Sequence, residues 1–265
     1  MSSGDEALAD RAKNGHLQRS HMETIADLLK VGADDAIALG APERTPHLTY
    51  CELRRLVGAI THDLNALGIG RDDRVVLVLP NGPEAAAAFV SVAACSTAAP
   101  LSPGLTADEL KFNLSDLRAK ALVIQEGIRS PAREVAAQLG VKILELVPEP
   151  ARATGAFALK PSQRDGAMAE KGGPAGPEDV ALVLHTSGST SRPKIVPLLQ
   201  RNVTASARNI QRSLQLTADD VCLNIMPLFH IHGLMAAVLA SLAAGAQVSC
   251  TTGFNALRFF HWLDE

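Results

Sequence analysis

A chain of 265 residues can form one large domain or two smaller ones, since domains commonly hold roughly 100 to 200 residues, and either arrangement can bury a core. Hydrophobic residues make up 47% of the sequence and aromatic residues only 3%, so the core must be built mainly from Ala, Val, Leu and Ile. The formal net charge of -3 and the scattered Lys and Arg residues argue against the basic surface of a nucleic-acid-binding protein.

Three further features favour a cytoplasmic protein. The four cysteines lie far apart and lack a CxxC spacing, which favours reduced thiols. Residues 1–22 are polar and lack the apolar centre of a signal peptide, so we expect a flexible tail. The apolar stretch 231–246 is shorter than the roughly 20 residues that span a bilayer. We therefore expect a buried helix there and no membrane span.

In chain order, the first helix signal lies at 50–67, where apolar residues recur at helical spacing. Thr49 and Glu52 are placed as a capping box, and Gly68 as the stop. The short apolar segment 74–80 then predicts a buried strand that ends at the turn sequence PNGP. Further helices are expected at 84–95, 106–117 and 131–139, and further strands at 98–103, 120–125 and 141–147.

Residues 148–178 are rich in Pro, Gly, Ala and charge, which predicts a mobile connector. After it we expect strands at 180–186, 195–198, 221–227 and 247–252, and helices at 200–214, 231–246 and from 256 onwards. The alternation predicts an α/β fold, with parallel strands in doubly wound sheets and helices on both faces. The expected parts are a tail at 1–22, a first α/β part at 23–147, the connector, and an incomplete second α/β part at 179–265.

The loop between the strands at 180–186 and 195–198 has the residues of an anion site. Small polar residues precede a lysine there: Thr186, Ser187, Gly188, Ser189, Thr190 and Lys194. Such a loop can turn backbone N–H groups and hydroxyls toward one point, and a lysine adds a mobile cationic charge. The alternative is a solvated turn that binds nothing. A Walker loop is disfavoured, because Pro193 precedes Lys194 where that motif has glycine.

The order TSGSTSRPK resembles the phosphate loop of the adenylate-forming superfamily, which includes acyl-CoA synthetases, nonribosomal adenylation domains and luciferases. It departs from that pattern at Ser191, where glycine is usual, although the form HTSGTTSRPKGVPL of oxalate-CoA ligases shares the serine. It also departs at Ile195, where glycine nearly always follows the lysine. A branched residue does not readily adopt positive φ, so a loop that needs that conformation would lose mobility or affinity.

The resemblance extends over nearly the whole chain from about Glu23. LTYCEL, LPN, PE and PLSP follow one another as in the family's opening segments, and MPLFHIHG at 226–233 is similar to the family's PLFHxxG segment. The resemblance implies the large N-terminal domain of the adenylate-forming fold, truncated, with the C-terminal domain absent. This chain alone is therefore expected to be inactive.

The resemblance also implies a two-step ligase. A carboxylic acid reacts with ATP to give an acyl-adenylate and pyrophosphate, and coenzyme A then displaces AMP. The loop residues Thr186 to Thr190 and Lys194 would hold the phosphates, Lys194 would be catalytic, and Thr190 would lie beside Mg²⁺. The motif forms favour a small acid such as oxalate.

His230 and His232 follow the strand expected at 221–227, at the end where open α/β sheets place ligands. A histidine there can contact a carboxylate. The alternative is a pair of histidines packed beside the apolar helix. The resemblance places His230 at the acyl pocket as a catalytic and substrate-binding residue, and His232 is a further substrate candidate.

Two other functions remain open. One is a non-catalytic nucleotide-binding or interaction fragment of a degenerate paralogue, which Ile195 would suggest. The other is an adenylation domain that loads a carrier protein instead of coenzyme A. The paired aspartates at 72–73 and 219–220 precede strands and are interpreted as solvated turns.

Overall fold

The computed structural model describes residues 22–162, 168–186 and 194–264. The strands are β1 (Ile37–Ala41), β2 (Arg44–Thr49), β3 (Arg74–Val78), β4 (Thr97–Pro100), β5 (Ala121–Gln125), β6 (Lys142–Pro148), β7 (Phe157–Pro161), β8 (Val180–Thr186), β9 (Lys194–Leu199), β10 (Val221–Asn224) and β11 (Gln247–Cys250). The helices are α2 (Ile25–Leu28), α3 (Tyr50–Ala66), α4 (Pro83–Ala93), α5 (Ala107–Asp116), α6 (Ala132–Gln138), α7 (Gln200–Ser213), the π-helix η1 (Gly233–Leu239), α8 (Ala240–Ala244) and α9 (Phe259–Asp264).

The strands form two sheets. The larger has the order β7-β6-β5-β3-β4-β8-β9 and the smaller the order β10-β11-β1-β2. Strands β3 to β6 and β8 pair in parallel, as do β10, β11 and β1. Because β8 and β9 join the larger sheet while β10 and β11 join the smaller one, the expected parts 23–147 and 179–265 share both sheets.

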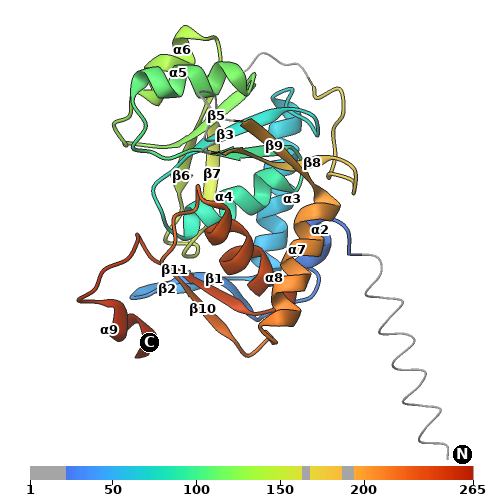
Figure 1. Cartoon of the computed structure of the whole chain (residues 1–265), viewed down its shortest axis with the longest axis vertical. Helices are drawn as coiled ribbons and strands as arrows, with labels where there is room; N and C mark the ends of the chain where they lie inside the picture. The colour runs from blue at the N-terminus through green and yellow to red at the C-terminus, as the bar shows by residue number, and fades with distance from the viewer. Residues whose placement is uncertain (1–21, 163–167, 187–193, 265) are drawn as a thin grey trace, which may run out of the picture.

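Helices lie on both faces of the larger sheet (Figure 1). Helices α5 and α6 cover one face, and α3 and α4 lie between the two sheets. The larger apolar cluster fills the space between the sheets, whereas a second cluster joins the sheet to α5 through Leu110 and Leu114 and to α6 through Val135. The fold is therefore the layered α/β arrangement that the sequence predicts.

The capping box predicted for the first long helix is confirmed, and a second helix begins in the same way. Thr49 and Glu52 form a reciprocal capping box at α3, and Thr106 and Glu109 form another at α5. In each, the threonine hydroxyl accepts from the backbone N–H three residues on, and the glutamate accepts from the threonine N–H. These contacts satisfy backbone donors that the first helical turn leaves unpaired.

The sequence-based assignment was wrong in three places. It gave no strands at β1 and β2, and it placed a connector where β7 pairs with β6. It also expected only parallel strands, whereas β1–β2, β6–β7 and β8–β9 are antiparallel. The strand β2 is polar and gives no apolar period, whereas β1 and β7 are five-residue segments whose pairing is fixed by the sheet that they join.

The apolar stretch 231–246 forms the π-helix η1 followed by α8, and most of its side chains are buried. No helix in the described ranges is both long and apolar enough to cross a membrane.

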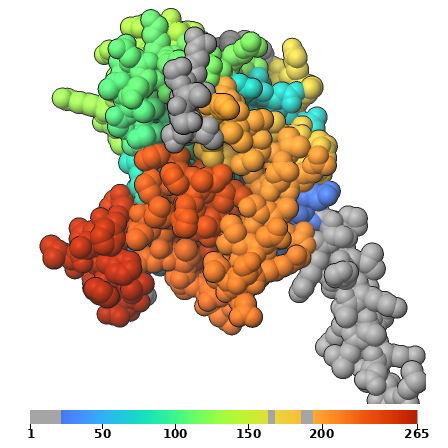
Figure 2. All heavy atoms as spheres, in the orientation of Figure 1, coloured from blue at the N-terminus to red at the C-terminus, as the bar shows by residue number. Residues whose placement is uncertain are grey.

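The last residues form a lobe at the lower left of the surface view (Figure 2). Arg258 attaches this lobe to the rest of the fold, because it pairs with Glu43. Its guanidinium also lies 5.4 Å from the ring centroid of Trp262.

Candidate functional site

The hairpin of β8 and β9 carries the predicted phosphate loop. The two strands pair from Val180 opposite Leu199 to Thr186 opposite Lys194, so their ladder closes at the residues that flank the loop. The predicted phosphate-binding residues Ser187, Gly188, Ser189 and Thr190 lie outside the described residues. Their roles, including that of Thr190 beside Mg²⁺, stay predictions. The side chain of Lys194 is exposed at the start of β9.

Ile195 is an ordinary strand residue in this structure. It lies in the ladder opposite His185, is half-buried, and packs against the second apolar cluster. The non-glycine residues with positive φ in the described ranges are Glu43, Arg118 and Gln215. The branched side chain at 195 is therefore compatible with its backbone, because an extended residue needs no positive φ.

The two candidate histidines follow β10 of the smaller sheet. The backbone N–H of His230 donates to the carbonyl of Pro227 at 3.2 Å, and the N–H of His232 donates to Nδ1 of His230 at 3.3 Å. Both side chains are exposed. The structure thus brings His230 and His232 together, whereas Lys194 lies on the hairpin of the larger sheet.

Asn81 fixes the segment that carries these histidines. Its Nδ2 donates to the carbonyls of Met226 at 3.2 Å and Thr251 at 3.1 Å, and its Oδ1 accepts from the N–H of Leu228 at 2.8 Å. One side chain after β3 thereby joins the loops that follow β10 and β11. The sequence PNGP predicts a turn and does not reveal these contacts of Asn81. The signal for a functional position was its place directly after a buried strand.

Gly233 lets η1 begin close to the preceding loop. A Cβ on this residue would lie 2.6 Å from the carbonyl oxygen of Pro227, which is closer than real Cβ contacts allow. The first turn of η1 is further joined to the loop by the N–H of Leu234, which donates to the carbonyl of His230 at 3.2 Å. Short π-helical segments are frequently found next to functional residues.

A pocket of about 370 Å³ opens beside Asn81, at the carboxyl ends of β3 and β11. Thr251 and Thr252 lie on one of its walls, and the ion pair of Arg44 and Glu84, 2.5 Å apart, lies on another. Open α/β sheets bind ligands at this end of their strands. The pocket combines hydroxyls and backbone groups with two guanidiniums that are each paired with a carboxylate, so its lining is polar but gives no preference for an anion.

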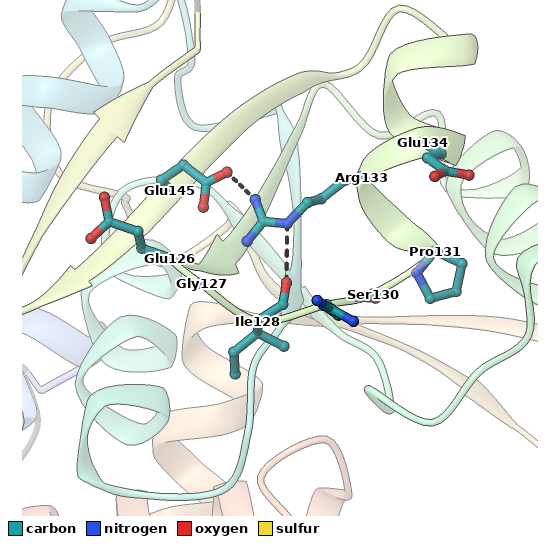
Figure 3. Close-up of a pocket in the computed structure, with 9 residues that line it drawn as sticks. Glu126, Gly127, Ile128, Ser130, Pro131, Arg133, Glu134 and Glu145 are labelled. Carbon is teal, nitrogen blue, oxygen red and sulfur yellow. Dashed lines mark hydrogen bonds and ion pairs between the residues drawn. The ribbon is translucent and has the colours of Figure 1, made fainter.

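A larger hollow of about 940 Å³ lies at the carboxyl end of β5, between this strand and α6 (Figure 3). Of its two arginines, Arg133 pairs with Glu145 and donates to the carbonyls of Gln125 at 2.7 Å and Ile128 at 3.2 Å, whereas Arg129 is exposed. Because no described residue of the motif segments 186–194 and 226–233 lines this hollow, we do not assign the predicted site to it. Among the described residues, no group of three or more His, Cys, Asp or Glu side chains is arranged to hold a metal ion.

Comparison with known proteins identifies the family. The model of the AMP-binding enzyme family matches residues 30–265, so this chain belongs to that family, as its motifs predicted. It is 38% identical over 219 residues to the oxalate-CoA ligase of Arabidopsis thaliana, covering 81% of this chain and 42% of that protein. It is 31% identical over 253 residues to the oxalate-CoA ligase of Saccharomyces cerevisiae, covering 85% and 47%. The chain thus spans less than half the length of these relatives.

Solved structures share the fold. The apo structure of MatB from Rhodopseudomonas palustris superposes with a TM-score of 0.74 at 23% identity, over 91% of this chain and 48% of that one. Mycobacterium smegmatis MbtA superposes with a TM-score of 0.73 at 26% identity, over 96% of this chain and 49% of that one. These matches confirm the fold class expected from the sequence.

Proposed function

We propose that the protein to which these residues belong is an ATP-dependent carboxylic acid-CoA ligase. In its first step a carboxylate oxygen attacks the α-phosphorus of ATP, and pyrophosphate leaves. In its second step the thiol of coenzyme A attacks the acyl carbon and AMP leaves. The observation that carries the proposal is the family match over 30–265 together with a hairpin whose ladder closes at Thr186 and Lys194, the two ends of the phosphate-loop motif.

In this proposal the charge of Lys194 balances the triphosphate as the bond to pyrophosphate breaks. The side chain is exposed at the end of the hairpin, where it can reach a ligand held by the loop. Phosphoryl chemistry depends mainly on positioning and on electrostatic stabilisation. Mg²⁺ would add further positive charge at the phosphates, with Thr190 as its proposed neighbour.

The acid would lie near the segment 226–233. We propose that His230 contacts the carboxylate and that His232 lies at the same pocket, since both are exposed beside a loop fixed by Asn81. A small acid such as oxalate is our preferred substrate, because two relatives above 30% identity are named oxalate-CoA ligases. The chain is also 28% identical to a sulfoacetate-CoA ligase of Cupriavidus necator, so sulfoacetate must be tested as an alternative substrate. The free thiols support a cytoplasmic location.

The test is pyrophosphate exchange by the longest natural form of the protein, with oxalate, malonate, sulfoacetate, 4-coumarate and a short fatty acid as substrates. We expect exchange that depends on the acid and on Mg²⁺, and thioester formation when coenzyme A is added. ATP binding without exchange would instead support a non-catalytic paralogue. Thioester formation on a carrier protein but not on coenzyme A would support the carrier-loading alternative.

Lys194→Ala should slow exchange by about ten- to a hundredfold, since a charge-assisted contact is worth roughly 1.5 to 3 kcal/mol. Lys160→Ala is the matched control. Lys160 is also an exposed strand lysine, on β7, and its Nζ lies 3.6 Å from Glu126. Equal rates for the two variants would contradict the role given to Lys194.

A further inference from the structure

His185 and Asp116 form a contact that the proposed chemistry does not use. His185 lies near the end of β8, and its Nε2 is 3.0 Å from Oδ2 of Asp116, the last residue of α5. The imidazole side chain is only 11% exposed. The ring of Phe112, one turn earlier on α5, lies 6.3 Å from the imidazole between centroids. The helix thus holds this histidine through two side chains.

The hydrogen-bonded ladder of β8 and β9 connects His185 to the other strand of the hairpin. His185 pairs with Ile195, and Thr186 pairs with Lys194 at the next position. Paired residues present their side chains on the same face of a sheet. Ile195 accordingly packs against the apolar cluster to which Leu110 of α5 belongs. His185 of β8 is therefore held to α5, and Ile195 opposite it packs against the second apolar cluster; Lys194 is the neighbour of Ile195 on β9.

Asp116 is poorly placed for the helix itself. The carboxyl end of a helix carries partial negative charge, so an acidic side chain is disfavoured there and a basic one is preferred. No basic residue lies in the last turn of α5. A histidine N–H is a suitable compensating donor, and its bond to a carboxylate fixes the tautomer and the orientation of the ring. The contact thus joins the carboxyl end of α5 to β8 of the hairpin.

We propose that His185 and Asp116 are positioning residues for ATP, because they set where the hairpin presents Lys194. Neither residue touches the nucleotide; both act through the ladder of β8 and β9. This inference rests on the proposed function. It assigns to the α5 layer a part in nucleotide binding that the loop motif alone does not reveal.

The test measures KM for ATP, kcat and thermal unfolding in the longest natural form of the protein. His185→Ala should raise KM for ATP about five- to tenfold, because the lost contact is worth about one hydrogen bond. His185→Gln, whose amide can still donate to Asp116, should retain most of the affinity. The matched control is His261→Ala, since His261 also lies beside a carboxylate, with Nε2 3.4 Å from Glu43. That control should leave KM for ATP unchanged.

A double variant separates positioning from stability. Replacing both His185 and Asp116 by Ala also removes the acidic side chain that is disfavoured at the carboxyl end of α5, so thermal stability should recover relative to His185→Ala while KM for ATP stays raised. Recovery of both quantities together would overturn the proposal, as would a loss of stability in His185→Ala with an unchanged KM.

A readout independent of activity is amide hydrogen exchange in β9. His185→Ala should exchange faster at Lys194 to Val196, and His185→Gln should resemble the wild type. If the wild type lacks pyrophosphate exchange but these amides respond as expected, the ligase proposal fails and the positioning contact stands. Unchanged amide exchange in His185→Ala overturns the positioning contact whatever the activity.

Discussion

The two segments with predicted chemistry are held in different ways. The segment 226–233 is fixed by two hydrogen bonds to Asn81, a residue more than a hundred positions earlier that also bonds to Thr251, and by the close packing of Gly233 against Pro227. The β8–β9 hairpin lies at one end of the larger sheet, where its own ladder and the contacts to α5 hold it. Changes at the first segment should therefore appear mainly as lost stability, and changes at the hairpin mainly as lost ligand affinity.

The largest stability effect should follow Asn81→Ala. The variant loses three hydrogen bonds, each worth about 1 kcal/mol net, so we expect the free energy of unfolding to fall by about 3 kcal/mol. The midpoint of urea unfolding measures this change. Asn113→Ala is the control, because its one bond, from Nδ2 to the carbonyl of Glu109 at 2.7 Å, is exposed on α5. If Asn81→Ala and Asn113→Ala lowered the free energy of unfolding equally, Asn81 would hold the segment 226–233 no more firmly than one exposed bond holds α5.

Gly233→Ala should rank second. The added Cβ meets the carbonyl of Pro227 at 2.6 Å, and relieving such overpacking costs about 2 kcal/mol. Gly58→Ala is a matched control, since Gly58 lies in α3 with nothing within 4 Å of an added Cβ. That control should stabilise the protein by about 0.5 to 1 kcal/mol through helix propensity. A neutral Gly233→Ala in thermal unfolding would show that η1 can shift away from the loop.

Ile195→Gly tests the hairpin side of the comparison. Removing a half-buried side chain should cost about 1 kcal/mol of stability. Because the backbone at 195 is extended, glycine has no strain to relieve, so KM for ATP should not fall; it should rise about twofold or more, since the side chain that packs β9 against the second apolar cluster is lost. Ile195→Val, which keeps the branched side chain, is the control. A marked gain of ATP affinity in the glycine variant would mean that the loop does need the freedom that glycine provides.

The smallest effect at neutral pH concerns two thiols. Burial raises the pKa of Cys95 to about 11 and that of Cys250 to about 12, above the ordinary value of 9.0. Unfolded thiols ionise near 9.0 while the folded ones stay neutral, so the stability of the fold is unaffected by these thiols below pH 9.0 and falls as pH rises toward the folded values. Unfolding free energy measured against pH should fall less steeply in Cys250→Ala than in the wild type. Identical slopes would contradict a buried thiol next to Thr251.

Local signals were sufficient for much of the fold and for part of the site. The capping boxes at Thr49 and Thr106 and the order of most helices and strands could be predicted from the sequence, because caps and apolar periods act within a few residues. The order TSGSTSRPK likewise predicted a loop between two strands, and the family match agrees with the resemblance; the roles of Lys194 and the loop residues stay predictions. Anion binding by a loop produces such a local motif because neighbouring backbone groups must surround one anion.

Only the tertiary structure decided which distant segments meet. The pairing of β1 with β11, the strand β7 within the expected connector, the π-helix after His232 and the three bonds of Asn81 all join residues far apart or depend on packing around them. A five-residue strand such as β1 or β7 is specified by the partner that it joins, and the sequence around an asparagine in a turn does not reveal its distant partners. The sequence by itself determined the family and the order of most of its elements; the tertiary contacts determined how the segments with predicted chemistry are held.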